Sequence, residues 1–155
     1  APGGAALAEL LAPQAIRYVV VDTSALVVTT PRERLRRYAN VEERGGDMHA
    51  LAFKDGSFDL VVLMHALTYS AKPAQAVAEA ARVLKRGGRL LLSSLAKHEH
   101  QAVVHAYGHL NLGFSDRELR KFSERSGLQV SNLGTVTRER RPPHFEVISM
   151  IGIKP

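Results

Sequence analysis

Short apolar runs alternate with amphipathic stretches along the chain, and this alternation predicts parallel β-strands joined by helices. Three of the runs are continuous, as is typical of strands buried on both faces: Tyr18–Val21, Phe58–Met64 and Leu90–Leu92. Val41–Arg44 is a weaker candidate for an edge strand. The pattern therefore predicts an α/β fold with a mostly parallel sheet.

The first part of the chain predicts two helices. Ala5–Leu11 is expected to form a short helix that ends at Pro13. Ser24–Tyr38 is mostly helical in pattern, although Val27–Thr30 favours a strand and Pro31 would break or kink a helix.

The third predicted helix begins at Pro73, because a proline at the first helical position loses no hydrogen bond. Its apolar residues lie at helical spacing and predict a buried face that includes Val77 and Leu84. Gly87 and Gly88 are expected to end it, since glycine suits the left-handed position after a helix.

The last third of the chain is different in character. His98–Gly108 is polar, rich in histidine and expected to be helical, and Ser115–Ser126 is a clearer helix because Ser115 and Glu118 have capping-box spacing. Leu128–Leu133 and Phe145–Ile153 predict two strands. With no helix between them, these strands are expected to be antiparallel neighbours.

The composition is typical of a soluble globular protein of one domain, with 155 residues, 45% hydrophobic and 23% charged. The chain has no cysteine, which excludes a disulfide framework, a cysteine zinc site, a thiol nucleophile and an iron–sulfur cluster. No apolar stretch approaches the roughly 20 residues of a membrane span. Because the chain also opens without a secretory pattern, we expect a cytoplasmic protein.

The formal net charge is +6, and arginines cluster in Arg32–Arg37 and in Arg138–Arg141. Such clusters can bind the phosphates of nucleic acid. No aromatic residues interleave with them to stack on bases, so a solvated basic surface is the favoured interpretation.

Two acids follow predicted strands, where open α/β sheets bind ligands. Asp22 ends the first strand, and its carboxylate could accept two hydrogen bonds from a ribose diol or could cap the next helix. Asp47, 25 residues later, could accept from an adenine amino group while Met48 covers the ring, or the two could be a turn aspartate and a core methionine. Gly3 lies in a small-residue turn before the first helix, whose N-terminus could bind an anion.

The segment Gly46–Leu92, from G-D-M-H-A-L-A-F to L-K-R-G-G-R-L-L-L, resembles class I S-adenosylmethionine (SAM)-dependent methyltransferases of the subgroup that resembles quinone-biosynthesis enzymes. The resemblance extends from about Gly3 to Ile153. It implies a Rossmann-like three-layer sandwich with seven strands, the last of them antiparallel. It also implies that Asp22 holds the SAM ribose and that Asp47 and Met48 contact the adenine. Met64 and His65 would then face the methionine part of SAM.

The chain departs from that family at its start. Within Ala1–Ala5, only Gly3 matches a glycine of the family's glycine-rich turn. The strand that precedes this turn in the family is missing. That strand is central in the fold, so its absence would leave the strands on both sides of it without a hydrogen-bonding partner. Each backbone polar group left unpaired in this way would cost about 1–3 kcal/mol of stability. We therefore expect residues 1–155 to be a single SAM-binding domain, the C-terminal part of a longer protein.

A finer resemblance lies in the carboxyl third. His98–His100, Tyr107–His109, Leu112–Ser115 and Arg138–Val147 are similar to the methyltransferase-like domain fused to ArsR-type transcriptional regulators. This implies an effector domain that senses SAM or S-adenosylhomocysteine (SAH) without turnover, with DNA bound by an upstream domain. A further alternative is a degenerate domain that no longer binds a cofactor and serves to pack two copies of the chain into a homodimer.

Four of the seven histidines lie between His98 and His109. His105 and His109 have the spacing of one helix face, but no acid motif accompanies them, so we expect no metal site. A lid over the SAM site, with one imidazole as general base, is the preferred hypothesis. The candidates for the base or for acceptor contacts are His65, Tyr69, His100 and His105.

Methyl transfer needs mainly in-line placement of the acceptor, because the sulfonium is already activated. The sequence therefore predicts a SAM-dependent methyltransferase domain acting on a small-molecule acceptor, with the SAM or SAH sensor as the alternative.

Overall fold

The structure is a computed structural model of the chain, and it describes residues 2–22 and 37–155. The chain divides into two compact units, residues 1–52 (the amino unit) and 53–155 (the carboxyl unit). The predicted helix over 24–38 and the first arginine cluster, apart from Arg37, lie outside the described residues.

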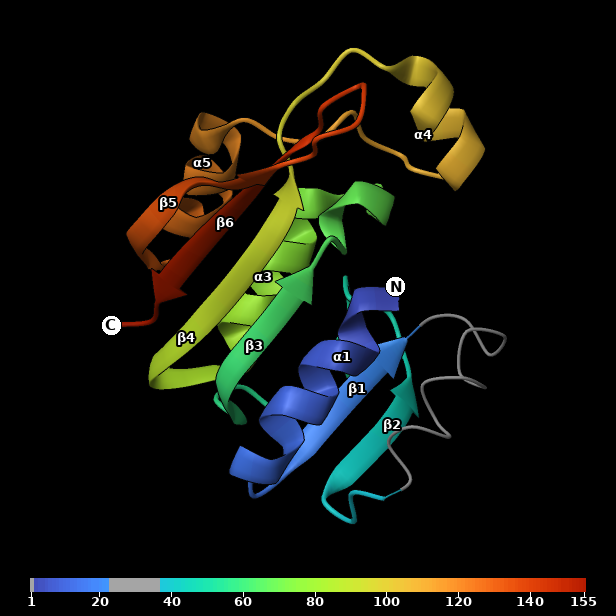
Figure 1. The fold of residues 1–155 in the computed structure, drawn as a ribbon. Helices are drawn as coiled ribbons and strands as arrows, with labels where there is room; N and C mark the ends of the chain where they lie inside the picture. Colours follow the sequence, from blue (N-terminus) through green and yellow to red (C-terminus); the bar gives the residue numbers. More distant parts are fainter. Residues whose placement is uncertain (1, 23–36) are drawn as a thin grey trace. The chain divides into compact units, whose positions relative to one another are not determined.

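The amino unit contains two helical segments followed by a two-stranded sheet (Figure 1). Its elements are α1 (Pro2–Leu11), the 3-10 helix η1 (Ala12–Gln14), β1 (Tyr18–Asp22) and β2 (Val41–Gly45). β1 and β2 are parallel, with Tyr18 beside Val41 and Asp22 beside Gly45. Both strands therefore confirm the sequence prediction.

Asn40 fixes the end of the first helical segment to the start of β2. Its side-chain amide donates to the carbonyl oxygens of Ala12 at 2.6 Å and Ala15 at 2.9 Å, and its own carbonyl accepts from the N–H of Tyr18 at 3.0 Å. One side chain thus satisfies two backbone acceptors and sets where β1 and β2 begin their pairing.

The carboxyl unit contains a four-stranded sheet of strand order β3-β4-β6-β5 (Figure 1). The strands are β3 (Phe58–Met64), β4 (Leu84–Leu95), β5 (Gln129–Arg138) and β6 (Glu146–Ile153). β3 and β4 are parallel, whereas β6 is antiparallel to both β4 and β5. The predicted antiparallel pair at the end of the chain is confirmed.

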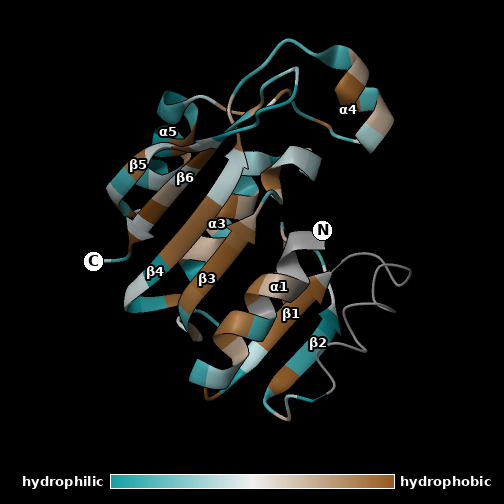
Figure 2. Ribbon diagram, viewed as in Figure 1, coloured by the Kyte–Doolittle hydropathy of each residue, from teal (hydrophilic) through white to brown (hydrophobic). Residues whose placement is uncertain are grey.

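Two longer helices, α3 (Pro73–Val83) and α5 (Asp116–Arg125), contact each other and the sheet, while η2 (Leu67–Tyr69) and α4 (Gln101–Tyr107) are short. Strand alternation and helical periodicity bring the apolar side chains together. Leu90 and Leu92 of β4, Met150 of β6 and Leu119 of α5 are fully buried. Figure 2 shows the apolar colouring along β3, β4 and the facing side of α3.

Several predicted boundaries are confirmed by local hydrogen bonds. α3 begins at Pro73, and α5 begins after Ser115, whose hydroxyl accepts from the N–H of Glu118 while the Glu118 carboxylate accepts from the N–H of Ser115. Gly127 follows α5 with φ +81°, a conformation that glycine adopts without strain.

The prediction that Gly87 and Gly88 end α3 is wrong. The helix ends at Val83, because the next residue, Leu84, enters the core and begins β4. The N–H of Gly87 instead donates to the carbonyl of Lys154 at 2.7 Å, and the Lys154 N–H donates to Gly88 at 2.9 Å. Long-range pairing with the end of the chain therefore decides this segment.

Two helices also differ from their predicted extents. α1 begins at Pro2, so Gly3 lies in its first turn and not in a turn before it. α4 covers only Gln101–Tyr107 and is followed by Gly108 in the left-handed conformation, with φ +65°. His98 lies outside the helix because its N–H donates to the carbonyl of Leu112 at 2.8 Å, in an extended stretch.

Candidate functional site

The two acids that sequence analysis selected follow neighbouring parallel strands. Asp22 is the last residue of β1 and is paired with Gly45, the last residue of β2. Asp47 comes two residues after Gly45. Parallel strands end at the same edge of a sheet, so the backbone places both acids at one edge of the amino unit.

The loop that carries Asp47 passes close to β1. A Cβ atom on Gly46 would lie 3.0 Å from Cγ1 of Val21, the residue before Asp22. A side chain at position 46 would therefore require Val21 or the Asp47 loop to shift by a few tenths of an ångström.

Asp47 is ionised and partly available to a ligand. Its Oδ1 accepts from the backbone N–H of His49 at 2.9 Å and lies 2.5 Å from Nδ1 of the same residue. These two bonds, the backbone one first, hold the pKa of Asp47 below its usual range. The side chain is 59% exposed, and no described residue hydrogen-bonds Oδ2. The carboxylate can therefore accept a further hydrogen bond, while the neighbouring Met48 is half-buried.

Gly3 contributes backbone groups rather than a turn. It is the second residue of α1, where N–H groups have no partner within the helix. Such N–H groups can bind an anion. The turn that was expected before the helix is not seen among the described residues, because α1 already begins at Pro2.

Met64 and His65 lie at the carboxyl end of β3, within the carboxyl unit. Met64 pairs with Ser93 of β4, and the N–H of His65 donates to the Ser93 carbonyl at 2.9 Å. His65 adopts φ +52°, an uncommon conformation for a residue with a side chain, and so turns the chain sharply after the strand. Burial and repulsion from His109 lower the pKa of His65, so its imidazole is neutral near pH 7.

The four candidate bases differ in their surroundings. The ring of Tyr69 contacts His109 with centroids 5.1 Å apart, and the ring of His100 contacts Phe145 at 5.6 Å. His105 is exposed on α4. His65 is the half-buried one of the four and directly follows a strand.

The proposed helix face with His105 and His109 is not formed. α4 ends at Tyr107 and Gly108 reverses the backbone, so His109 lies beyond the helix. Within residues 2–22 and 37–155, no three metal-ligating side chains come together as a metal site would need.

Sequence analysis did not select His98 and His109 as site residues. The structure places His98 against Phe145, with ring centroids 4.7 Å apart, and repulsion from His109 is one of the causes that lower the pKa of His98. The sequence signals for these residues were the richness of this segment in histidine and its resemblance to the domain fused to ArsR-type regulators. Neither signal indicates the contact with Phe145, which is far away along the chain.

A family model described as a methyltransferase domain matches residues 1–92, more than half of the chain. The chain belongs to this methyltransferase family. The matched segment includes both acids of the amino unit as well as Met64 and His65, and it ends within β4.

Curated relatives match a little over half of this chain. An uncharacterized 37.1 kDa protein in a transposon of Streptomyces fradiae is 41% identical over 86 residues, 56% of this chain and 25% of that protein. A ubiquinone/menaquinone biosynthesis C-methyltransferase of Pseudoalteromonas translucida is 30% identical over 92 residues, 57% of this chain and 37% of that enzyme. The matches thus span well under two thirds of these relatives.

A solved structure shows the same fold over nearly the whole chain. A Bacillus halodurans protein named as a candidate methyltransferase superposes with a TM-score of 0.82, covering 99% of this chain and 89% of that one at 23% identity. The Rossmann-like α/β fold expected from the sequence is therefore confirmed.

SAM is the cofactor of this methyltransferase family, and when bound its sulfonium supplies an activated methyl group. The described residues fit its nucleoside: an ionised, exposed Asp47 with an available oxygen lies at the edge where β1 ends. No helix among the described residues is long and apolar enough to cross a membrane.

Proposed function

We propose that this chain transfers the SAM methyl group to a small-molecule acceptor, and that Asp22 and Asp47 hold the SAM nucleoside. The observation that supports this most strongly is the in-register pairing that ends β1 at Asp22 beside Gly45, two residues before Asp47. A ribose diol and an adenine amino group both donate hydrogen bonds, and two carboxylates at one sheet edge can accept them.

Other residues have supporting roles in this proposal. Met48 covers a face of the adenine with its polarizable side chain, and the N–H groups around Gly3 bind the carboxylate of the methionine part. Met64 and His65 are the residues that the sequence resemblance assigns to that methionine part. His65, neutral near pH 7, is the preferred candidate for a base, with Tyr69, His100 and His105 as further candidates.

The test is calorimetric binding of SAH to Asp22→Asn and Asp47→Asn variants. Each variant loses a charged hydrogen-bond acceptor, which is expected to weaken binding by about 1–3 kcal/mol, or roughly 5- to 150-fold in Kd. Asp59→Asn is the matched control, since Asp59 is also an exposed acid but lies near the start of β3. Unchanged affinity in both Asp22 and Asp47 variants would contradict the assignment.

An alternative proposal is a domain that binds SAM or SAH without turnover, as an effector of an ArsR-type regulator. It rests on the resemblance of residues 98–147, which lie outside the segment that the family model matches. Incubation with SAM and a panel of acceptors distinguishes the two proposals. SAH binding tighter than SAM binding, with no SAH produced beyond background, would favour the sensor.

A further inference from the structure

Six aromatic or imidazole rings gather in the carboxyl unit beyond the ends of β3 and β4. We name them the ring cluster: Tyr69, His98, His100, Tyr107, His109 and Phe145. The rings form two groups of three. His98 contacts His100 and Phe145, with centroids 5.7 and 4.7 Å apart, and His109 contacts Tyr69 at 5.1 Å and Tyr107 at 5.9 Å. Among the described residues no ring contact joins the two groups, although repulsion from His109 reaches His98. All but Tyr69 come from residues after 92, the part of the chain outside the family match.

The hydrogen bonding of His98 determines where its proton lies. Its Nδ1 accepts from the backbone N–H of His100 at 3.1 Å. A neutral imidazole that accepts at Nδ1 carries its hydrogen at Nε2. Burial, then repulsion from His100 and His109, lowers the pKa of His98, so this neutral form is the one present near pH 7.

The Nε2–H of His98 is a donor without an acceptor. Nε2 is buried and has no hydrogen-bond partner among the described residues, and the same holds for Nδ1 of His109. Buried polar atoms in proteins are almost always paired, so an unpaired nitrogen in each group of rings indicates a polar atom that a bound group can pair.

A ligand can reach these atoms only if the cover over them moves. α4 has no buried residue, so little apolar packing holds it in position. Tyr107, on its last turn, is 68% exposed and Tyr69 is 45% exposed. The faces of these two tyrosine rings are therefore accessible, whereas the two nitrogens are buried.

We propose that the ring cluster binds the methyl acceptor, as a flat, uncharged ring with a hydrogen-bond acceptor atom to which His98 Nε2–H donates. This inference rests on the proposed methyltransferase function. Aromatic and imidazole side chains favour a flat ring. None of the six rings forms an ion pair with a carboxylate, lysine or arginine of the described residues, and the neutral His98 offers a hydrogen-bond donor without a charge.

The chemistry of the ligand is tested with four small probes in NMR titrations of protein labelled with 15N-histidine. Quinoline offers a ring nitrogen and 2-naphthol an oxygen, whereas naphthalene has no acceptor atom and N-methylquinolinium is charged. The better of the first two is expected to bind about tenfold more tightly than the last two, as one hydrogen bond predicts. The His98 Nε2 resonance should shift most. Equal binding of naphthalene would overturn the proposal.

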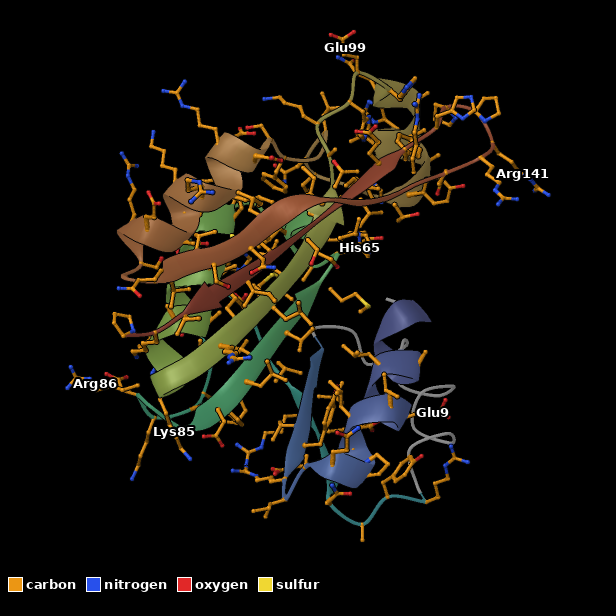
Figure 3. All side chains as sticks on the ribbon, turned by 60° about the vertical axis from the view of Figure 1, so that its left-hand side comes forward. Glu9, His65, Lys85, Arg86, Glu99 and Arg141 are labelled. Carbon is orange, nitrogen blue, oxygen red and sulfur yellow. The ribbon has the colours of Figure 1, made fainter. Side chains whose placement is uncertain are left out.

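Two substitutions of His98 separate the hydrogen bond from ring packing. His98→Phe keeps a ring against Phe145 but has no donor, and is expected to weaken binding of the better probe about tenfold. His98→Gln offers an N–H at a similar reach and should restore most of the affinity. Glu99→Gln is the control, because Glu99 is exposed and its side chain points outward from the chain (Figure 3). Wild-type affinity in a folded His98→Phe protein would contradict the role of His98.

SAH calorimetry on the same proteins separates this inference from the proposed function. We expect SAH to bind wild type and His98→Phe equally and not to displace the probe. If SAH binds and no probe does, the ring cluster is not the acceptor site, although the proposed function stands. If the probe binds and SAH does not, the proposed function fails. Displacement of the probe by SAH would assign the rings to the cofactor and overturn the inference.

Discussion

The two units of this chain are stabilised by different interactions. Among the described residues, Ala12 is the one buried apolar residue of the amino unit, whereas the carboxyl unit buries Leu90, Leu92 and Met150 completely. The amino unit depends on main-chain pairing between β1 and β2 and on polar bonds from Asn40. The carboxyl unit instead has a sheet with helices packed against it.

This difference separates stability from proposed function. The acids proposed to bind SAM lie in the unit with few buried side chains, where local opening costs less free energy. Cofactor affinity is then expected to depend on how well the amino unit is ordered, and the stability of the whole chain on the carboxyl unit. The predictions below test this separation, beginning with the largest effect.

Leu92→Ala is expected to reduce the free energy of unfolding by about 2–5 kcal/mol, because it opens a cavity in the core of the carboxyl unit. Urea denaturation followed by circular dichroism measures the loss. Leu91→Ala is the control, since Leu91 lies on the other face of β4 and is only half-buried. Equal losses in the two variants would contradict the description of one buried face.

Asn40→Ala is expected to cost about 1–3 kcal/mol, because the carbonyls of Ala12 and Ala15 lose their donor. Hydrogen exchange should speed up in β1 and β2 while β4 and β6 keep their protection. SAH affinity should fall as well if the amino unit must be ordered to bind it. The control is Asn132→Ala on exposed β5, and equal loosening of both units would show that they do not open separately.

Acid should affect the carboxyl unit first. The lowered pKa values of His65 and His98 mean that the unfolded chain binds protons near pH 6.5 while the folded chain does not, so stability falls as pH decreases from about 7 to 5. The lowered pKa of Asp47 affects stability only at lower pH. Its stabilising contribution is present above the ordinary carboxyl pKa of about 4 and is lost as pH falls below that value.

Hydrogen exchange at pH 7 and pH 5 measures this small effect for each unit. Protection around β3 and β4 should decrease at pH 5, and His98→Gln should reduce the decrease. An equal decrease in the amino unit at pH 5 would assign the acid sensitivity to other groups.

Local chemistry made several elements predictable. A continuous run of β-branched residues predicted β1, and an apolar run predicted the bounds of β3 at Phe58 and Met64. The capping-box spacing of Ser115 and Glu118 predicted the start of α5. Each of these signals acts over a few residues, so the sequence contains all the information that they need.

Long-range contacts decided the rest. The turn at Gly87 is set by a hydrogen bond to Lys154, and α4 is shortened because His98 pairs with Leu112. Neither partner can be identified from local pattern, because nothing within a window of neighbouring residues indicates which distant segment will pair.

The proposed site shows the same division. By itself, the sequence determined that acids follow two strands, that the chain resembles methyltransferases and that histidines concentrate near residue 100. Only the tertiary structure decided that β1 and β2 end side by side, that His98 contacts Phe145 and that His109 contacts Tyr69. Periodicity and capping are properties of neighbouring residues, whereas a site depends on side chains that folding brings together from distant segments.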